Sequence, residues 1–255
     1  MTTQPPMTVA VAGATGRVGR HIVEVLDERG HGVVPISRSH GVDVITGDGL
    51  AAALAGVECV IDATTGSSPD EDAATEFFTT AARNLHDAGQ RAGVQRMVVV
   101  SIIGTDQFTA GYGAAKLAHE RAMRSGPIPA RVLRSAQFHP FVAQLVEWGM
   151  QGDVSYVPKM RTQLVAARTV AEALADLATA PEPTETPISE IAGPREESLV
   201  EIATLFASRR GLPLKIEGVN NAAELYGLDE TGALLPGPGA VLAGPTFEEW
   251  LDSTP

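Results

Sequence analysis

The chain has 255 residues, a length that suits one α/β domain with a smaller appended lobe better than two independent domains. Hydrophobic residues make up 44% and charged residues 20% of it, a balance typical of globular proteins and not of disordered ones. The formal net charge of -12 argues against a general binder of nucleic acids or anionic membranes, because nothing offsets the repulsion from phosphates.

Cysteine and histidine usage limits the covalent and metal chemistry. Cys59 is the single cysteine, so no internal disulfide can form, and its apolar neighbours predict a buried side chain rather than a reactive thiol. The histidines lack ligand spacing, so we expect no metal site. The N-terminus lacks the features of a signal peptide, and no apolar run approaches the ~20 residues that a bilayer requires. We expect a cytoplasmic protein.

Predicted strands and helices alternate up to about residue 138. Short apolar runs predict strands at 8–12, 32–37, 42–46, 57–62, 96–101 and 130–134. Helical spacing of apolar residues predicts helices at 17–29, 47–55, 70–92 and 113–124. Because parallel strands need long crossovers, this alternation indicates an α/β fold with a doubly wound parallel sheet. The loops that follow the strands then open on one edge, where ligands bind.

The pattern loosens after Phe138. The predicted elements are short strands at 154–157, 163–166 and 214–217, helices at 169–178 and 199–209, a turn or helix at 247–251, and an exposed connector at 181–187. We expect a single domain over 1–255. Its core would be an α/β unit at 7–138, followed by a small mixed lobe at 139–255 whose helix near 169–178 returns to the core.

The loop Gly13-Ala14-Thr15-Gly16-Arg17-Val18-Gly19 follows the first strand and opens the first helix. Gly13 permits a tight turn, Gly16 lets the backbone approach a pyrophosphate, and Gly19 lets the helix pack close to the strand. The main-chain N–H groups of Arg17 and Val18 would point at the phosphates, helped by the helix dipole. A mere tight turn is the alternative, but the strand and helix on either side favour a bound dinucleotide. We therefore expect residues 7–138 to be a dinucleotide-binding Rossmann core and residues 139–255 to be a mixed substrate-side lobe.

The end of the second strand selects the dinucleotide. An acidic residue there favours NAD and an arginine favours NADP, and the sequence Ser37-Arg38-Ser39 contains no acid. Arg38 offers a bidentate fork to a 2′-phosphate, although a solvated surface arginine would have the same sequence. Asp48 is compatible with two roles, a hydrogen bond to the adenine amino group or the N-cap of the following helix. The sequence thus predicts NADP as cofactor.

Six segments together resemble a known family. They are the glycine loop, Ser37-Arg38, Gly47-Asp48, Val98-Val99-Val100-Ser101, Tyr112-Gly113-Ala114-Ala115-Lys116, and Leu133-Arg134-Ser135-Ala136-Gln137-Phe138-His139. Their order resembles the atypical short-chain dehydrogenase/reductase superfamily, and most of all its NmrA-like NAD(P)H-binding branch. The resemblance implies a Rossmann sheet of strand order 3-2-1-4-5-6(-7) and a cleft roofed by the C-terminal part. That branch includes reductases, isomerase-like enzymes and redox sensors.

The resemblance also implies a catalytic trio. Tyr112 would donate a proton to a carbonyl oxygen, Lys116 would lower the pKa of that tyrosine and bind the nicotinamide ribose, and Ser101 would polarise the carbonyl. Tyr112 and Lys116 lie four residues apart and hence on one helix face. The alternative for Tyr112 is an aromatic that packs at the helix start without donating a proton. Asn84, on the helix where family members carry an asparagine relay, fits a packing position better.

Further residues are placed by their loops. Ala63, Thr64 and Thr65 follow the fourth strand and would line the adenosine and pyrophosphate side through their backbone. Phe138 would contact the nicotinamide side. His139 follows the sixth strand, where it would act as an acid or base or, as we favour, form a helix-entry hydrogen bond.

We therefore expect an NADP(H)-dependent oxidoreductase that transfers hydride to a small carbonyl-like substrate, as a monomer or homodimer. Two alternatives stay open. One is a non-catalytic NADP(H) redox sensor. The other is a nucleotide-sugar epimerase with retained NAD, against which Arg38 argues.

Overall fold

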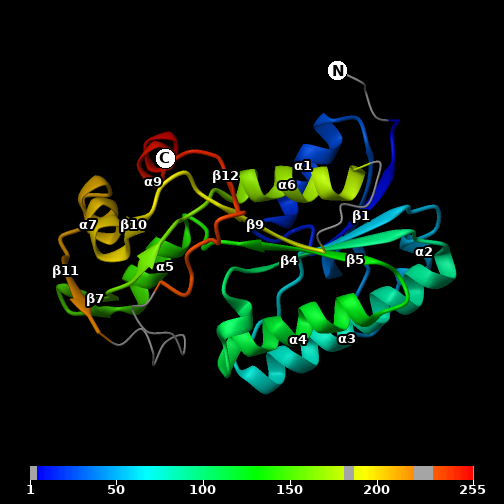
Figure 1. The fold of residues 1–255 in the computed structure, drawn as a ribbon, viewed down its shortest axis with the longest axis horizontal. Coiled ribbons are helices and arrows are strands. Elements are labelled where there is room, and N and C mark those ends of the chain that lie inside the picture. The colour runs from blue at the N-terminus through cyan, green and yellow to red at the C-terminus, as the bar shows by residue number, and fades with distance from the viewer. Residues whose placement is uncertain (1–4, 181–186, 221–231, 255) are drawn as a thin grey trace.

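The computed structural model describes residues 5–180, 187–220 and 232–254 (Figure 1). Within these ranges, no helix is both long enough and apolar enough to cross a membrane.

A seven-stranded sheet forms the centre of the molecule, and all of its strand pairs are parallel. Its order is β12-β9-β5-β4-β3-β1-β2. The strands are β1 (Thr8–Ala12), β2 (Gly32–Ile36), β3 (Cys59–Asp62), β4 (Arg96–Ile102), β5 (Ala130–Ser135), β9 (Ile188–Ala192) and β12 (Val241–Leu242). Because these strands are parallel, their carboxyl ends all meet at one edge.

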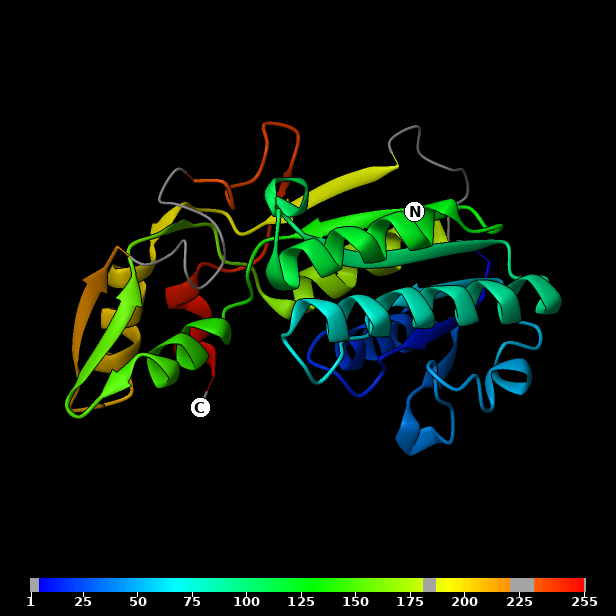
Figure 2. The same ribbon diagram turned by 90° about the horizontal axis from the view of Figure 1, so that it is seen from below.

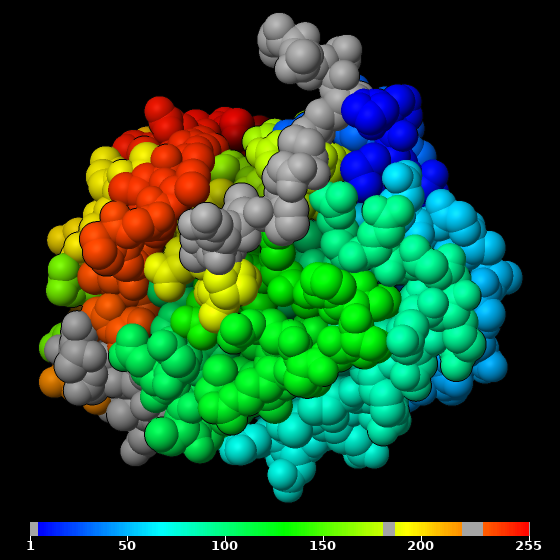
Figure 3. Space-filling view, turned by 45° about the vertical axis from the view of Figure 1, so that its right-hand side comes forward, coloured from blue at the N-terminus to red at the C-terminus, as the bar shows by residue number. Residues whose placement is uncertain are grey.

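Helices cover both faces of this sheet (Figures 1 and 2). One face carries α1 (Gly19–Glu28) and α6 (Ala167–Thr179), and the other carries α2 (Leu50–Ala53), α3 (Glu71–Ala92) and α4 (Gly111–Ser125). The cyan α3 and the green α4 lie side by side, also in the space-filling view of Figure 3. Two short 3-10 helices, η1 (Arg38–His40) and η2 (Thr105–Gln107), follow β2 and β4.

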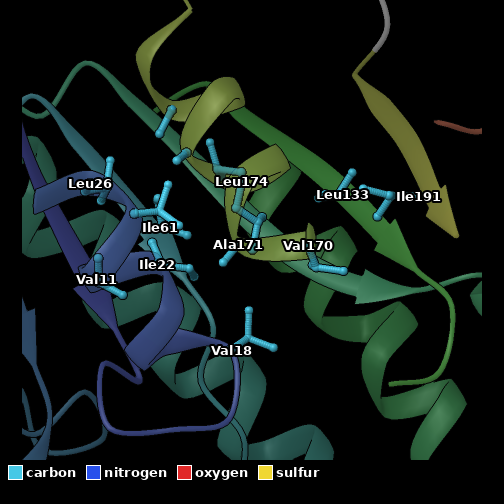
Figure 4. Close-up of a cluster of buried hydrophobic side chains, with 14 of the residues drawn as sticks. Val11, Val18, Ile22, Leu26, Ile61, Leu133, Val170, Ala171, Leu174 and Ile191 are labelled. Atoms are coloured by element: carbon cyan, nitrogen blue, oxygen red, sulfur yellow. The ribbon is translucent and has the colours of Figure 1, made fainter. Parts of the chain in front are cut away.

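Strand alternation divides the core into two layers. In β1, Val9 and Val11 pack under α1 and α6, whereas Ala10 and Ala12 face α2 and α3. Figure 4 shows the first layer, in which Ile22 of α1 and Leu174 of α6 belong to one buried cluster over the sheet. Burial on both faces explains why the strands are continuous apolar runs. Cys59 is fully buried, which confirms the predicted burial, and this burial raises the pKa of its thiol to about 12.

The remaining elements build a lobe beyond the carboxyl edge (Figure 1). They are α5 (Phe141–Trp148), β6 (Met150–Gln151), β7 (Val154–Pro158), β8 (Arg161–Thr162), β10 (Glu197–Ser198), α7 (Leu199–Arg209), β11 (Lys215–Val219) and α9 (Phe247–Ser253). They form the small sheets β11-β7-β6 and β10-β8 and enclose a separate apolar core around Phe247. The predicted α/β fold with a doubly wound parallel sheet is confirmed.

The strand expected at 42–46 is wrong. Glycines at 41, 47 and 49 adopt positive φ and break this segment into turns, and the Asp43 carboxylate accepts a hydrogen bond from the Ile45 N–H. Val42 is buried without any strand ladder. β2 therefore ends the sheet, and its Pro35 lies opposite Val11 of β1.

Other differences fall mainly after residue 138. The strand expected at 163–166 is only an isolated bridge between Phe138 and Val165. The helix α5 and the central-sheet strands β9 and β12 are among the elements that were not predicted. The helix expected at 47–55 is shorter, spanning Leu50–Ala53.

Candidate functional site

The glycine turn after β1 is built around close main-chain approaches. Gly13 has φ of +78°, and a Cβ on it would lie 2.6 Å from the Ala63 carbonyl oxygen. A Cβ on Gly19 would lie 2.0 Å from the carbonyl oxygen of Gly13. No residue larger than glycine fits either position without moving backbone. The turn therefore brings the first turn of α1 directly against the end of β1.

Free hydrogen-bond donors remain at the mouth of this turn. Within the described residues, the main-chain N–H groups of Arg17 and Val18 form no hydrogen bond. The first turn of α1 has neither a side-chain cap nor an acidic residue. Uncapped N–H groups at a helix N-terminus suit an anion. The residues present thus fit a dinucleotide pyrophosphate, as the sequence predicts. Thr15 is exposed in the same turn.

The segment after β2 presents a cation and hydroxyl groups. Arg38 is exposed, and its guanidinium has no partner among the described side chains. The Ser37 hydroxyl lies 2.9 Å from that of Ser39 and 2.7 Å from Nδ1 of His40. No carboxylate stands at this position. The group fits the 2′-phosphate expected there, and it includes His40, which the sequence analysis did not assign to it.

Asp48 lies in the neighbouring loop, and its predicted N-cap role is wrong. The N-cap of α2 is Gly49, without a side-chain cap, and the Asp48 carboxylate accepts from the Thr46 hydroxyl at 2.8 Å. Asn84 has a packing role, as expected, because its amide donates to the main-chain carbonyls of Val44 and Ile45 in this loop.

The loop after β3 connects the glycine turn to α4. Ala63 packs over Gly13, and Thr64 is buried with its hydroxyl and N–H donating to Asp62. The Thr65 hydroxyl lies 3.0 Å from the Tyr112 hydroxyl. The tyrosine therefore stands at the same edge as the glycine turn.

Lys116, one turn further along α4, is directed into the protein. Its Nζ donates to the Val100 carbonyl at 2.9 Å and lies 3.0 Å from Nδ1 of His119. Burial lowers the pKa of Lys116 to about 8, although Asp62 and Glu120 oppose this. Burial raises the pKa of Tyr112, and the hydrogen bond from Thr65 offsets this only in part. The raised pKa of Tyr112 thus reflects its burial, and the lowering by Lys116 that the family resemblance implies stays a prediction.

Ser101 is separate from this pair. It is buried at the end of β4, and its hydroxyl lies 3.4 Å from that of Thr105. In the described part of the chain, no hydrogen bond joins Ser101 to Tyr112 or Lys116. Phe138 is partly buried and packs on the core layer under α6.

His139 is fully buried between the sheet and the lobe. The centroid of its ring lies 5.6 Å from that of Phe247 and 5.1 Å from that of Trp250, so both aromatics pack against it. Neither ring nitrogen has a hydrogen bond of good geometry to a described residue, so the expected helix-entry bond is wrong for the side chain. The main-chain carbonyl accepts instead, from Val142. Burial lowers the pKa of His139 to about 4, offset only in part by Leu164.

Because His139 is buried, we expect the unfolding free energy of the protein to fall in acid. The unfolded chain binds a proton near pH 6.5 but the folded protein does so only near pH 4, so stability falls as the pH drops between these values. In wild type, this group should lower the unfolding free energy by about 2 kcal/mol between pH 7.5 and pH 5, measured by urea denaturation. In His139→Leu this contribution should be absent. His40→Leu, at an exposed position, should leave the wild-type pH dependence in place. The same dependence of unfolding free energy on pH in wild type and His139→Leu would contradict this prediction.

Besides His40, sequence reasoning missed Asp62 and His119. Nε2 of His119 lies 2.9 Å from the Asp62 carboxylate, and both side chains are fully buried. The available signals were a carboxylate closing the apolar run of β3 and a histidine three residues after Lys116, on the same helix face.

A family model described as NAD(P)H-binding matches residues 13–181 of the chain. Two curated proteins align with shorter parts. The photosystem II assembly factor Ycf39 of Synechocystis sp. is 31% identical over 116 residues, which are 40% of this chain and 36% of that protein. The 3-beta-hydroxysteroid dehydrogenase of Mycolicibacterium neoaurum is 33% identical over 111 residues, 35% of this chain and 30% of that protein. The alignments thus span about a third of these relatives.

Solved structures share the fold over nearly the whole chain. The dTDP-4-dehydrorhamnose reductase of Bacillus anthracis, in complex with NADP, superposes with a TM-score of 0.73 and 16% identity, covering 98% of both chains. A short-chain dehydrogenase/reductase superfamily protein from Agrobacterium tumefaciens with bound NAD gives a TM-score of 0.68 and 19% identity, covering 96% of this chain and 95% of that one.

Proposed function

We propose that this chain, which belongs to the NAD(P)H-binding family, is an NADP(H)-dependent oxidoreductase of the short-chain dehydrogenase/reductase type that reduces a small carbonyl-like substrate. The observation that carries the proposal is the position of the Tyr112 hydroxyl. It lies 3.0 Å from Thr65, in the loop whose Ala63 covers Gly13 of the pyrophosphate turn. A proton donor thus stands beside the cofactor turn.

In this proposal, separate residues bind the cofactor and donate the proton. The N–H groups of Arg17 and Val18 bind the pyrophosphate, and Arg38 with Ser37 binds the 2′-phosphate. When bound at these residues, the cofactor would supply the hydride that the carbonyl carbon of the substrate accepts. Tyr112 donates its hydroxyl proton to the carbonyl oxygen, so that the product is an alcohol. Lys116 supplies a positive charge one helical turn away, which favours the phenolate that remains.

NADPH is expected to bind at least about tenfold tighter than NADH, equivalent to ~1.4 kcal/mol. Arg38→Gln removes the cation that pairs with the 2′-phosphate, so it should weaken NADPH binding and leave NADH binding unchanged. Fluorescence titration of each cofactor measures both affinities. Arg91→Gln, an exposed arginine in the last turn of α3, should change neither. Equal affinities of wild type for the two cofactors would overturn the assignment of Arg38.

A second candidate, a non-catalytic NADP(H) sensor of the NmrA-like type, is favoured by one specific observation. The Ser101 hydroxyl is paired with that of Thr105. A substrate carbonyl that accepts from Tyr112 would therefore lack Ser101 as its second hydrogen-bond donor. A screen of carbonyl compounds for loss of NADPH absorbance separates the two functions. The sensor predicts tight NADPH binding with no turnover for either wild type or Tyr112→Phe.

A further inference from the structure

A continuous hydrogen-bonded chain runs beneath the proposed active site. Lys116 Nζ lies 3.0 Å from Nδ1 of His119, whose Nε2 lies 2.9 Å from Oδ2 of Asp62. The other carboxylate oxygen of Asp62 accepts from the Thr64 N–H at 2.9 Å and from its hydroxyl at 2.7 Å. The chain therefore links α4 to the end of β3 and to the loop that contacts Tyr112.

With Lys116 charged, only one protonation pattern satisfies every member of this hydrogen-bonded series. The ammonium of Lys116 can only donate, so Nδ1 of His119 must accept. The proton of the neutral imidazole is then on Nε2, where it is donated to the Asp62 carboxylate. The opposite tautomer would place two donors against each other at Lys116 and a lone pair against a carboxylate at Asp62. His119 is thus fixed as the neutral Nε2–H form.

The surrounding charges leave Asp62 as the counter-ion of Lys116. Glu120 of α4 is the second carboxylate near Lys116, and it accepts two hydrogen bonds from Arg134 of β5, at 3.0 and 2.9 Å. Burial and the Lys116 ammonium lower the pKa of His119, against the opposing effect of Asp62. Burial opposes the charge on Asp62, but its contacts with His119 and Thr64 outweigh it and lower its pKa to about 2.

Aromatic packing closes the cluster from the α3 side. Phe78 stacks on the His119 ring with 4.6 Å between centroids and lies 4.5 Å from the ammonium of Lys116. The three polar side chains are each at most 4% exposed. A lysine side chain normally samples many rotamers, and this one is restricted by a hydrogen bond to His119, one to Val100 and an aromatic face.

We propose that Asp62 and His119 are positioning residues that hold the Lys116 ammonium at the carboxyl end of β4, so that it is pre-ordered for the cofactor. Among the described residues the ammonium has two hydrogen-bond acceptors, which leaves one N–H for a cofactor hydroxyl. The inference rests on the proposed function only in that the ligand is the dinucleotide. It concerns binding and does not require turnover.

The test compares two replacements of His119. His119→Leu removes both hydrogen bonds, and we expect it to raise the Kd of NADPH roughly ten- to hundredfold, as for loss of a charge-assisted hydrogen bond. His119→Gln restores an acceptor for Lys116 and a donor for Asp62, so its Kd should return to within about threefold of wild type. Both values come from NADPH fluorescence titration. His86→Leu is the matched control, because His86 is also buried beside α4 but bonds only the Met123 carbonyl.

A second readout needs no cofactor. Long-range proton–nitrogen NMR of the free wild-type protein at pH 7 should show His119 as the neutral Nε2–H tautomer. An Nδ1–H tautomer, a charged ring at this pH, or wild-type NADPH affinity of His119→Leu would overturn the positioning role. If His119→Leu does not fold, the tautomer and the His119→Gln affinity decide. Failure of wild type to bind NADPH would instead overturn the proposed function. The NMR result would still decide whether the hydrogen bonds from Lys116 through His119 to Asp62 exist.

Discussion

Replacing Tyr112 by phenylalanine is expected to lower kcat about 10²- to 10⁴-fold, the contribution typical of a positioned proton donor. The ring, which packs edge-to-face on Phe78 at 5.8 Å, stays in place, and only the hydroxyl bonded to Thr65 is lost. The Kd of NADPH should therefore stay within about twofold of wild type, and stability should change by less than about 1 kcal/mol.

The assay is loss of NADPH absorbance with a carbonyl compound that wild type reduces, with cofactor binding measured separately by fluorescence. Tyr156→Phe is the matched control, because it removes a hydroxyl from β7 in the lobe. It should leave kcat unchanged. Retention of wild-type kcat by Tyr112→Phe would remove Tyr112 as the proton donor, and the sensor function would then be preferred.

Gly19→Ala is expected to raise the Kd of NADPH at least about hundredfold, because the added Cβ would lie 2.0 Å from the Gly13 carbonyl oxygen. Main-chain atoms cannot yield as a flexible side chain does, so the turn and α1 must separate. The N–H groups of Arg17 and Val18 then lose their common direction, and each hydrogen bond to a charged group that is lost costs about 1.5–3 kcal/mol. Overpacking should also lower the unfolding free energy by about 1–3 kcal/mol.

Gly239→Ala provides the control, since a Cβ there meets no atom within 4 Å and its φ is not positive. Its NADPH affinity and its urea midpoint should match those of wild type. Tight NADPH binding by a folded Gly19→Ala protein would show that the pyrophosphate does not rest on this turn.

The sheet could be predicted from the sequence where local pattern and burial agree. β1, β4 and β5 are apolar runs covered on both faces, and the helices between them carry one apolar stripe each. The segment at 42–46 misled because Val42 and Val44 alternate like a strand, whereas glycine turns position them without a ladder. β9 was missed because three of its five residues are only partly buried, so its sequence ISEIA carries little strand signal.

Site residues could be predicted where their role follows from local sequence, such as a position directly after a strand or on one face of a helix. Gly13 and Arg38 follow strands directly, and Tyr112 and Lys116 share a helix face. The link from Lys116 to Asp62 could not be predicted, because 57 residues separate Asp62 from His119 in the chain and no local pattern pairs them. The direction of the lysine side chain is likewise a tertiary property, set by His119 and Phe78.

The outer border of the sheet has a consequence for association between molecules. β2 ends the described sheet, and a bare border strand offers N–H and C=O groups to strands of other chains. Pro35 has no N–H to offer and interrupts that row near its end. Strand addition from another molecule at this border is therefore discouraged.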